Sequence, residues 1–140
     1  MTTSTADALS GALARVGDRW SLLVVDALSD GPRRFADLEA ALPGIATNVL
    51  TQRLRRLEAD QVVMAVPYST RPRRFTYELT EAGRALGGAV RLLSQWNADH
   101  GGGDADTPSH PDCGTAMVAR WWCPTCDRPG DGSPPEVLWV

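Results

Sequence analysis

The sequence feature that most constrains the fold is a pair of short helical patterns separated by Pro43 and Gly44. The first pattern spans residues 35–42 and the second spans residues 47–60. Both repeat apolar residues at steps of three and four, which places those residues on one face of a helix. The apolar residues are Phe35, Leu38 and Leu42 in the first pattern and Leu50, Leu54 and Leu57 in the second. Two short helices joined by a glycine-containing turn predict a helix-turn-helix.

Two strand-like runs follow the second helical pattern. Residues 62–66 form an apolar run, and residues 75–79 alternate between apolar and polar side chains, as β-strands do. The loop between the two runs is basic, with the residues Arg71, Arg73 and Arg74. We therefore predict a winged helix-turn-helix, a mainly α-helical fold with a small β-wing at residues 67–75.

Helical patterns also flank this region on both sides. Apolar residues recur at helical spacing over residues 7–29, with a break at Gly17. After Thr80, which suits a helix cap, apolar residues follow at alternating steps of four and three as far as Trp96. This narrow apolar stripe is suited to packing either within its own domain or against a second copy of the chain.

Composition divides the chain into three parts. We predict one winged-helix domain over residues 1–100 and a flexible, glycine-rich linker over residues 101–109. The tail, residues 110–140, is rich in glycine and proline and too short for a hydrophobic core of its own. A piece of this size usually needs a metal, a disulfide or a docking surface to fold.

The distribution of charge is more informative than the net charge of −3. Residues 47–76 are rich in arginine and contain only Glu58 and Asp60 as acids, whereas acidic residues predominate after Gly101. The negative charge of such a tail offsets the positive charge of a basic patch, so the net charge of the chain does not reveal the patch. From charge alone, the arginines are equally well explained as ordinary surface residues.

The sequence also argues against two classes of protein. No apolar run approaches the ~20 residues of a membrane span, and residues 1–7 do not resemble a signal peptide, so we expect a cytoplasmic protein without a membrane partner. The sequence contains no recognisable catalytic triad, pair of catalytic carboxylates or phosphate-binding loop. We therefore do not expect an enzyme.

The second helix of the motif, residues 47–60, is the candidate to enter the major groove of DNA. When its leucine stripe is buried, side chains that can read base edges face away from the core or flank that face. The candidate DNA contacts on this helix are Thr47, Asn48, Thr51, Gln52, Arg55 and Arg56. In the wing, Arg71, Arg73 and Arg74 can hold phosphates or enter the minor groove. The alternative is a solvated polar face that touches no DNA.

The order of short motifs along the chain resembles the HxlR-type winged-helix regulators, which are related to the MarR type. The motifs are LARVGDRW (13–20), GPRRFADL (31–38), LPGI (42–45), LTQRLRRLE (50–58) and YELTEAG (77–83). The resemblance covers roughly residues 8–98. It implies a homodimer joined through its terminal helices, a recognition helix and a wing at the segments above, and repression or activation of genes near a near-palindromic operator.

One departure from this family concerns sensing. Redox-sensing members have a cysteine ahead of the first helix, whereas residues 2–10 contain none, so sensing by that thiol is excluded. Nothing else in the domain identifies a small-molecule effector.

All three cysteines lie in the tail, and with one histidine they form the pattern H-x2-C-x9-C-x2-C. The four residues are His110, Cys113, Cys123 and Cys126. Two short-spaced ligand pairs are typical of a zinc ribbon, and three thiolates with one imidazole would make a closed structural zinc site. The alternatives are a reversible disulfide, a zinc site that releases its metal on oxidation, or three unligated thiols.

Three functions remain open on the sequence. The first is a dimeric, sequence-specific transcription factor with a zinc-stabilised tail. The second is a protein-interaction adaptor that uses the winged helix and the tail as docking modules. A thiol oxidoreductase is the third, because Trp122 begins a W-C-x-x-C pattern, but the α/β fold that this chemistry requires does not fit in the tail.

Overall fold

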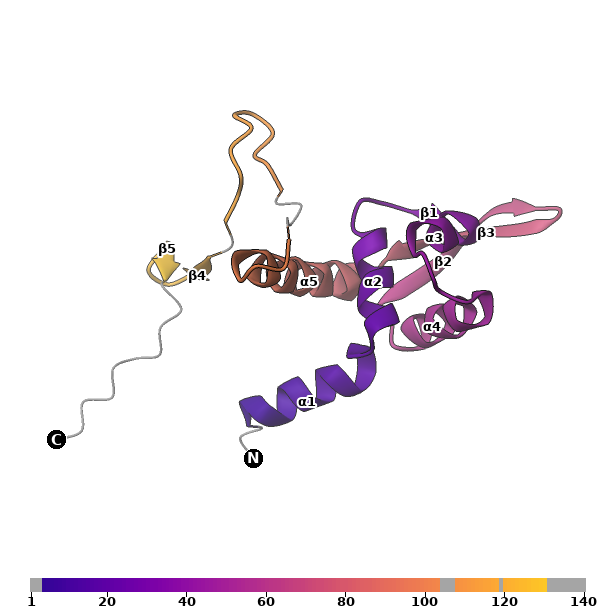
Figure 1. Cartoon of the computed structure of the whole chain (residues 1–140), viewed down its shortest axis with the longest axis horizontal. Coiled ribbons are helices and arrows are strands. Elements are labelled where there is room, and N and C mark those ends of the chain that lie inside the picture. Colours follow the sequence, from indigo (N-terminus) through magenta and orange to yellow (C-terminus); the bar gives the residue numbers. More distant parts are fainter. Residues whose placement is uncertain (1–3, 104–107, 119, 131–140) are drawn as a thin grey trace. The chain divides into compact units, whose positions relative to one another are not determined.

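The computed structural model describes residues 4–103, 108–118 and 120–130 (Figure 1). These form two compact units, residues 1–94 and residues 95–140. The division falls inside the last helix, and part of the predicted linker, residues 104–107, lies outside the described residues, as does the end of the tail, residues 131–140. None of the described helices is both long enough and apolar enough to cross a membrane.

The first unit begins with two helices, α1 (Thr5–Val16) and α2 (Arg19–Leu28). The predicted break at Gly17 is confirmed. α2 starts immediately after its cap residue Asp18, whose carboxylate accepts hydrogen bonds from the backbone N–H (3.1 Å) and the hydroxyl (2.6 Å) of Ser21. These bonds satisfy a backbone donor that the first turn of a helix would otherwise leave free.

The predicted helix-turn-helix is present as α3 (Phe35–Ala41) and α4 (Thr47–Ala59). Each helix ends within one residue of the predicted boundary. Gly44, in the turn between them, has φ of +88°, a conformation that glycine adopts without the steric cost of a Cβ atom. The residues before α3 form a short strand, β1 (Arg33–Arg34).

The wing is an antiparallel hairpin of β2 (Val63–Thr70) and β3 (Arg73–Leu79), with β1 paired to the other edge of β3. The sequence predicted a first strand that ends at Val66, but β2 continues to Thr70. Proline usually ends a strand because it has no N–H to donate. Here Pro67 lies at a register shift in an edge strand, where the missing donor interrupts little pairing.

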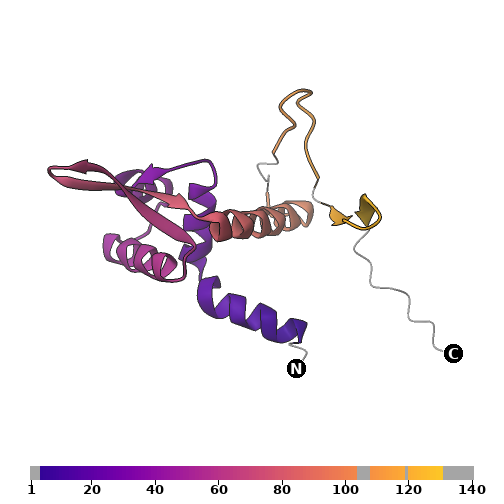
Figure 2. The ribbon, with the colours of Figure 1, turned by 180° about the vertical axis from the view of Figure 1, so that it is seen from behind.

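The core of the first unit lies between α2, the helix-turn-helix and the base of the wing. Its fully buried side chains include one residue of α3 and the whole predicted stripe of α4: Leu38, Leu50, Leu54 and Leu57, with Val24 and Val25 of α2. α5 (Glu81–Asp99) closes the unit and begins immediately after Thr80, whose hydroxyl accepts the Gly83 N–H at 3.1 Å. α1 and α5 extend from α2 on the side opposite to the wing (Figures 1 and 2).

In the second unit, residues 108–118 and 120–130 contain little regular structure. One antiparallel bridge joins Ser109 to Ala116, and a short hairpin pairs β4 (Trp121–Cys123) with β5 (Arg128–Gly130). Across residues 108–118 and 120–130, no side chain is buried. The described residues of this unit from 108 onward therefore form no hydrophobic core.

Candidate nucleic-acid interface

Four polar side chains of α4 line one open hollow on the protein surface. They are Asn48, Thr51, Gln52 and Arg55. The hollow faces outward because Leu50, Leu54 and Leu57, on the opposite side of α4, are at most 2% exposed and fix the rotation of the helix. The sequence predicted these four side chains as base-reading candidates, and the structure brings them together.

These side chains have few partners within the chain. The Thr51 hydroxyl donates to the Thr47 carbonyl at 2.9 Å, within the same helix. Arg55 acts on Tyr77 of β3, whose pKa is raised by burial and by the charge of Glu58, an effect that Arg55 opposes. Among the described residues, the side chains of Asn48 and Gln52 form no hydrogen bond to another side chain or backbone group. Their donors and acceptors are therefore available to a ligand.

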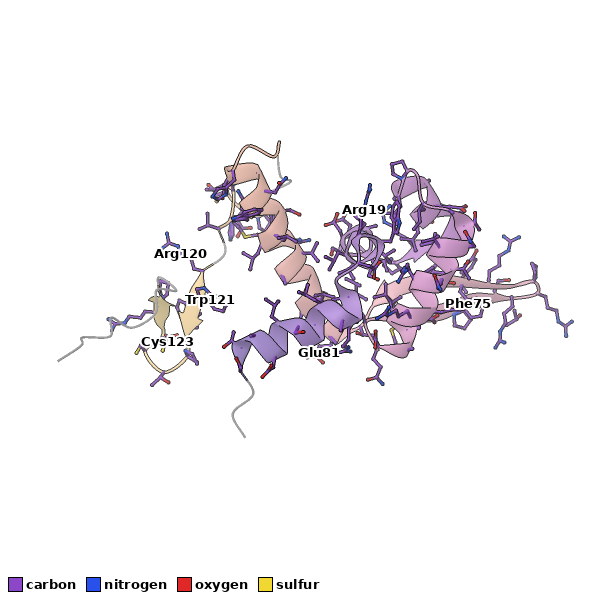
Figure 3. All side chains as sticks on the ribbon, turned by 60° about the horizontal axis from the view of Figure 1, so that its bottom comes forward. Arg19, Phe75, Glu81, Arg120, Trp121 and Cys123 are labelled. Atoms are coloured by element: carbon purple, nitrogen blue, oxygen red, sulfur yellow. The ribbon has the colours of Figure 1, made fainter. Side chains whose placement is uncertain are left out.

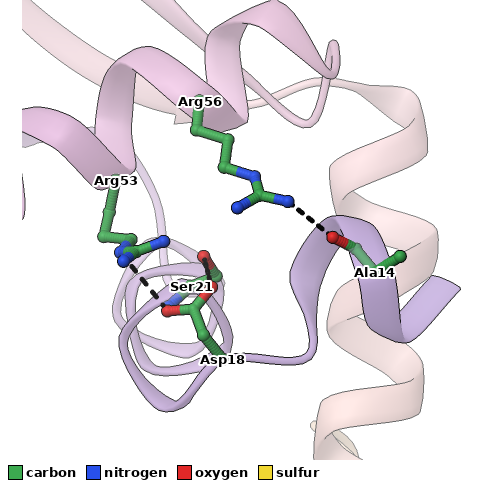
Figure 4. Close-up of polar contacts among 5 residues, drawn as sticks. All are labelled: Ala14, Asp18, Ser21, Arg53 and Arg56. Atoms are coloured by element: carbon green, nitrogen blue, oxygen red, sulfur yellow. Dashed lines mark hydrogen bonds and ion pairs between the residues drawn. The ribbon is translucent and has the colours of Figure 1, made fainter.

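The structure places the other two predicted residues of α4 elsewhere. The Thr47 hydroxyl donates to a carboxylate oxygen of Glu39 on α3. The Arg56 guanidinium donates to the backbone carbonyl of Ala14 on α1 at 2.5 Å (Figure 4). Neither residue lines the hollow, and their predicted contacts with DNA remain predictions.

Three arginines form contacts between two regions of the first unit. One region is α4 with Asp60, which follows it, and the other is the end of α1 with Asp18. Besides the bond from Arg56, the Arg53 Nε lies 3.5 Å from an Asp18 oxygen (Figure 4), and the Arg15 Nε lies 3.6 Å from an Asp60 oxygen. Burial alone would raise the pKa of the Asp18 carboxyl, but the Ser21 bonds and the charge of Arg53 together hold that pKa below its usual value of 3.8. Sequence reasoning missed these contacts because each joins residues far apart in the chain.

Replacing Asp18 is expected to destabilise the first unit. Asp18→Ala removes the cap of α2 and the partner of Arg53, so we expect the free energy of unfolding in urea to fall by about 1 kcal/mol near neutral pH. Asp18→Asn retains the capping oxygen and loses only the charge, so its loss is expected to be smaller. A stability of Asp18→Ala equal to that of the natural protein would contradict this role.

The same interaction gives a pH dependence with a defined sign. The folded-state pKa of Asp18 is depressed, so the carboxylate contributes stability above the usual aspartate pKa of 3.8 and loses it as pH falls through the lower folded value. The difference in stability between the natural protein and Asp18→Asn is therefore expected to shrink below that pH.

The wing carries the second group of predicted contacts. Arg71, Arg73 and Arg74 are exposed at or beside the turn between β2 and β3 (Figure 3, where Phe75 marks the hairpin). Arg73 lies over the Phe75 ring, 5.7 Å from its centre. Within the described ranges, none of the three forms an ion pair with an acidic side chain. No acidic side chain in the described part of the chain therefore neutralises their positive charge.

A further arginine, outside both the recognition helix and the wing loop, lies near the wing. Arg34 of β1 is exposed, and its guanidinium lies over the Tyr68 ring of β2, 5.0 Å from the ring centre. The order β1-β3-β2 brings this residue to the hairpin, and the sequence alone did not predict that pairing.

The predicted metal ligands of the tail form two separate pairs. The Cys113 sulfur lies 3.6 Å from the His110 Nδ1, and Cys123 and Cys126 share the turn of the β4–β5 hairpin. In the part of the chain that the structure describes, no three histidine, cysteine or acidic side chains converge on one point. A complete four-residue metal site is therefore not assembled in this structure.

Comparison with known proteins agrees with this architecture. A family model described as HxlR-like helix-turn-helix matches residues 15–104. The uncharacterized HTH-type transcriptional regulator YtcD of Bacillus subtilis is 38% identical over 85 residues, which cover 61% of this chain and 68% of YtcD.

Solved structures give the same result. A transcriptional regulator of the MarR family from Enterococcus faecalis V583 matches with a TM-score of 0.64 and 36% identity, over 71% of this chain and 91% of the other. The redox regulator HypR in its reduced form matches with a TM-score of 0.63 and 31% identity, over 66% of this chain and 92% of HypR.

Proposed function

The chain belongs to the HxlR-like helix-turn-helix family, whose relatives are transcriptional regulators, and from this premise we propose that it acts as a homodimer that recognises a specific operator sequence in double-stranded DNA. The observation that carries the proposal is the hollow of Asn48, Thr51, Gln52 and Arg55 on the outward face of α4. In this proposal α4 lies in the major groove and reads base edges through those four side chains.

The chemistry of the hollow matches the major-groove pattern of donors and acceptors. Asparagine and glutamine pair with the N6 and N7 positions of adenine, and arginine pairs with O6 and N7 of guanine. The cap position of α4 is Ala46, which provides no side-chain hydrogen bond to the first turn. The first amide groups of α4 are therefore available to a backbone phosphate, which would set the depth of the helix in the groove.

The wing would supply contacts that hold the protein on DNA of any sequence. In the proposal Arg71, Arg73 and Arg74 bind phosphates beside the groove that α4 occupies or enter the adjacent minor groove. Phosphate contacts position a protein on the duplex and carry no sequence information themselves. Specificity is therefore assigned to α4, and the wing is assigned to affinity.

Dimerisation is supported by apolar side chains that the single chain leaves exposed on its terminal helices. These are Leu9 and Leu13 on α1 and Leu92 and Leu93 on α5, each at least 50% exposed. Large apolar side chains gathered on two helices favour burial against a partner. A two-fold dimer would present two copies of α4 to half-sites one helical turn, about 34–36 Å, apart.

The proposal is tested first by selection of genomic DNA fragments with the purified protein, followed by titration of the selected site. Arg55→Ala is then expected to weaken the operator by roughly 5- to 150-fold, the equivalent of about 1–3 kcal/mol, and random DNA much less, because the variant cannot pair with a base. Fluorescence anisotropy with labelled duplexes of both kinds measures the two affinities.

Arg56→Ala is the matched control, because it removes the same side chain one position along α4. Its guanidinium is bonded to Ala14, so this variant is expected to lose stability while its preference for the operator over random DNA is retained. Equal losses on operator and random DNA for Arg55→Ala would contradict base reading by α4. If selection returned only weak, salt-sensitive binding, the result would favour the adaptor function.

A further inference from the structure

Two turns in the tail have the same design. The first, residues 110–114, has the sequence H-P-D-C-G, and the second, residues 123–127, has the sequence C-P-T-C-D. Each begins with a potential metal ligand followed by proline, and each ends with a cysteine followed by a residue of left-handed backbone. Those last residues are Gly114, with φ of +69°, and Asp127, with φ of +53°.

The backbone hydrogen bonds of the two turns also correspond. The Gly114 N–H donates to the His110 carbonyl at 2.8 Å, and the Asp127 N–H donates to the Cys123 carbonyl at 2.9 Å. An antiparallel pairing closes each turn, the Ser109–Ala116 bridge around the first and β4–β5 around the second. Asp127 adopts a left-handed conformation, which is uncommon outside glycine, at the position that Gly114 occupies in the first turn.

A polar side chain also lies beside the sulfur atom of the first turn. The Cys113 thiol is 3.3 Å from the Thr115 hydroxyl oxygen. The thiolate is the form of cysteine that binds metals.

The spacing of the first pair agrees with tetrahedral coordination of zinc. Zinc binds thiolate sulfur at about 2.3 Å and imidazole nitrogen at about 2.0–2.1 Å, so two such ligands at a tetrahedral angle lie about 3.6 Å apart. The Cys113 sulfur and the His110 Nδ1 are 3.6 Å apart. This histidine would therefore coordinate through Nδ1 with little change in the turn.

We propose that the two turns bind one Zn²⁺ ion between them, through His110 Nδ1 and the sulfurs of Cys113, Cys123 and Cys126. The ion would bring together two preformed ligand pairs. Three thiolates and one imidazole favour zinc over calcium or magnesium, which take oxygen ligands, and leave no position open for catalysis. The site is therefore structural.

The exposure of the apolar side chains in the described part of the tail explains why such a site would be needed. Met117, Val118, Trp121 and Trp122 are all exposed, so hydrophobic burial does not stabilise the segment by itself (Figure 3 labels Trp121 and Cys123). Binding of zinc to ligands that are brought together only in the folded state contributes its free energy to folding. The proposed site does not depend on DNA binding by the first unit.

The test measures zinc in the full chain, purified under reducing conditions with zinc and then freed of loosely bound metal. Mass spectrometry of the native protein and elemental analysis are expected to give one zinc per chain. Replacement of zinc by Co²⁺ is expected to give the visible absorption of a tetrahedral thiolate complex. Cys113→Ser, Cys123→Ser and His110→Asn are each expected to lower zinc affinity by at least tenfold.

The chain contains one other histidine, which provides the matched control. His100→Asn is expected to retain one zinc, since His100 bonds to the Trp96 carbonyl in α5 and lies outside both turns. Circular dichroism checks folding independently, because every described helix lies within residues 5–99 and its signal is expected to survive loss of the metal.

Three results would overturn the proposal. One is absence of zinc from the reduced chain. Another is half a zinc per chain with full retention in His110→Asn and Cys113→Ser, which would mean that the second turns of two chains share the ion. The third is a Cys123–Cys126 disulfide in freshly purified, metal-free protein that does not accept zinc after reduction, which would favour a redox pair.

Discussion

Replacing Arg71, Arg73 and Arg74 together with alanine is expected to weaken binding to DNA of every sequence. It is also expected to make the affinity less dependent on salt concentration. Removing one phosphate-binding charge changes the slope of log affinity against log salt by about 0.9 unit, so the slope of the triple variant is expected to fall by about 2–3 units. The affinities for operator and for random DNA are expected to fall by similar factors, because the proposal assigns affinity to the wing and base reading to α4. Titrations at several salt concentrations measure both quantities.

The lysine triple variant is the matched control for this prediction. Lysine keeps the three positive charges and loses the planar guanidinium groups, so the salt slope is expected to remain near that of the natural protein. A slope unchanged by the alanine triple variant would show that the wing does not touch phosphates. A loss confined to the operator would instead assign base reading to the wing, through insertion into the minor groove.

Replacing Gly83 with alanine is expected to cause the largest loss of stability among single substitutions in α5. A Cβ atom there would lie 2.1 Å from the Val62 carbonyl oxygen and 3.1 Å from the Leu79 side chain. The oxygen cannot move away freely because it accepts the Thr80 N–H at 3.1 Å. Overpacking of this kind costs up to about 3 kcal/mol or more, against a gain of about 1 kcal/mol in helix propensity.

The net loss of about 2 kcal/mol or more corresponds to a Tm lower by roughly 10 °C or more for a domain of this size. Gly88→Ala, five positions along α5, is the control because a Cβ atom at that position would have no other atom within 4 Å. That variant is expected to gain up to about 1 kcal/mol. Thermal unfolding at one fixed protein concentration compares the two, and equal Tm values would mean that α5 does not pack closely on Val62.

The sequence predicted the elements that depend on local patterns. The leucine stripe of α4 predicted both the helix and the face that it exposes. The sequence alone therefore placed Asn48, Gln52 and Arg55 on one face. The turn at Gly44 was predictable for the same reason, because a single residue type there permits the backbone conformation. The family resemblance placed the same elements in the same order, and the family match over residues 15–104 supports it.

Contacts between distant residues could not be predicted in this way. Arg53 and Arg56 look no different in sequence from Arg55, yet the fold pairs the first with Asp18 and the second with Ala14. The pairing of β1 with β3, which brings Arg34 to Tyr68, likewise depends on the tertiary arrangement. In the wing, Pro67 shortened the predicted strand because proline normally ends a ladder, and the register shift that accommodates it has no local signature.

Different residues of α4 contact the rest of the domain and face outward, and this separation has a consequence for the evolution of the protein. The arginines that hold α4 to the rest of the domain, Arg53 and Arg56, lie next in sequence to Gln52 and Arg55. Among the described residues, the side chains of Asn48, Gln52 and Arg55 form no hydrogen bond or ion pair with another element. In the proposed binding mode, substitutions at these three positions would redirect the protein to new target sites without first weakening the fold. Preference for a new operator would then be acquired one residue at a time, with no need for compensating mutations elsewhere in the domain.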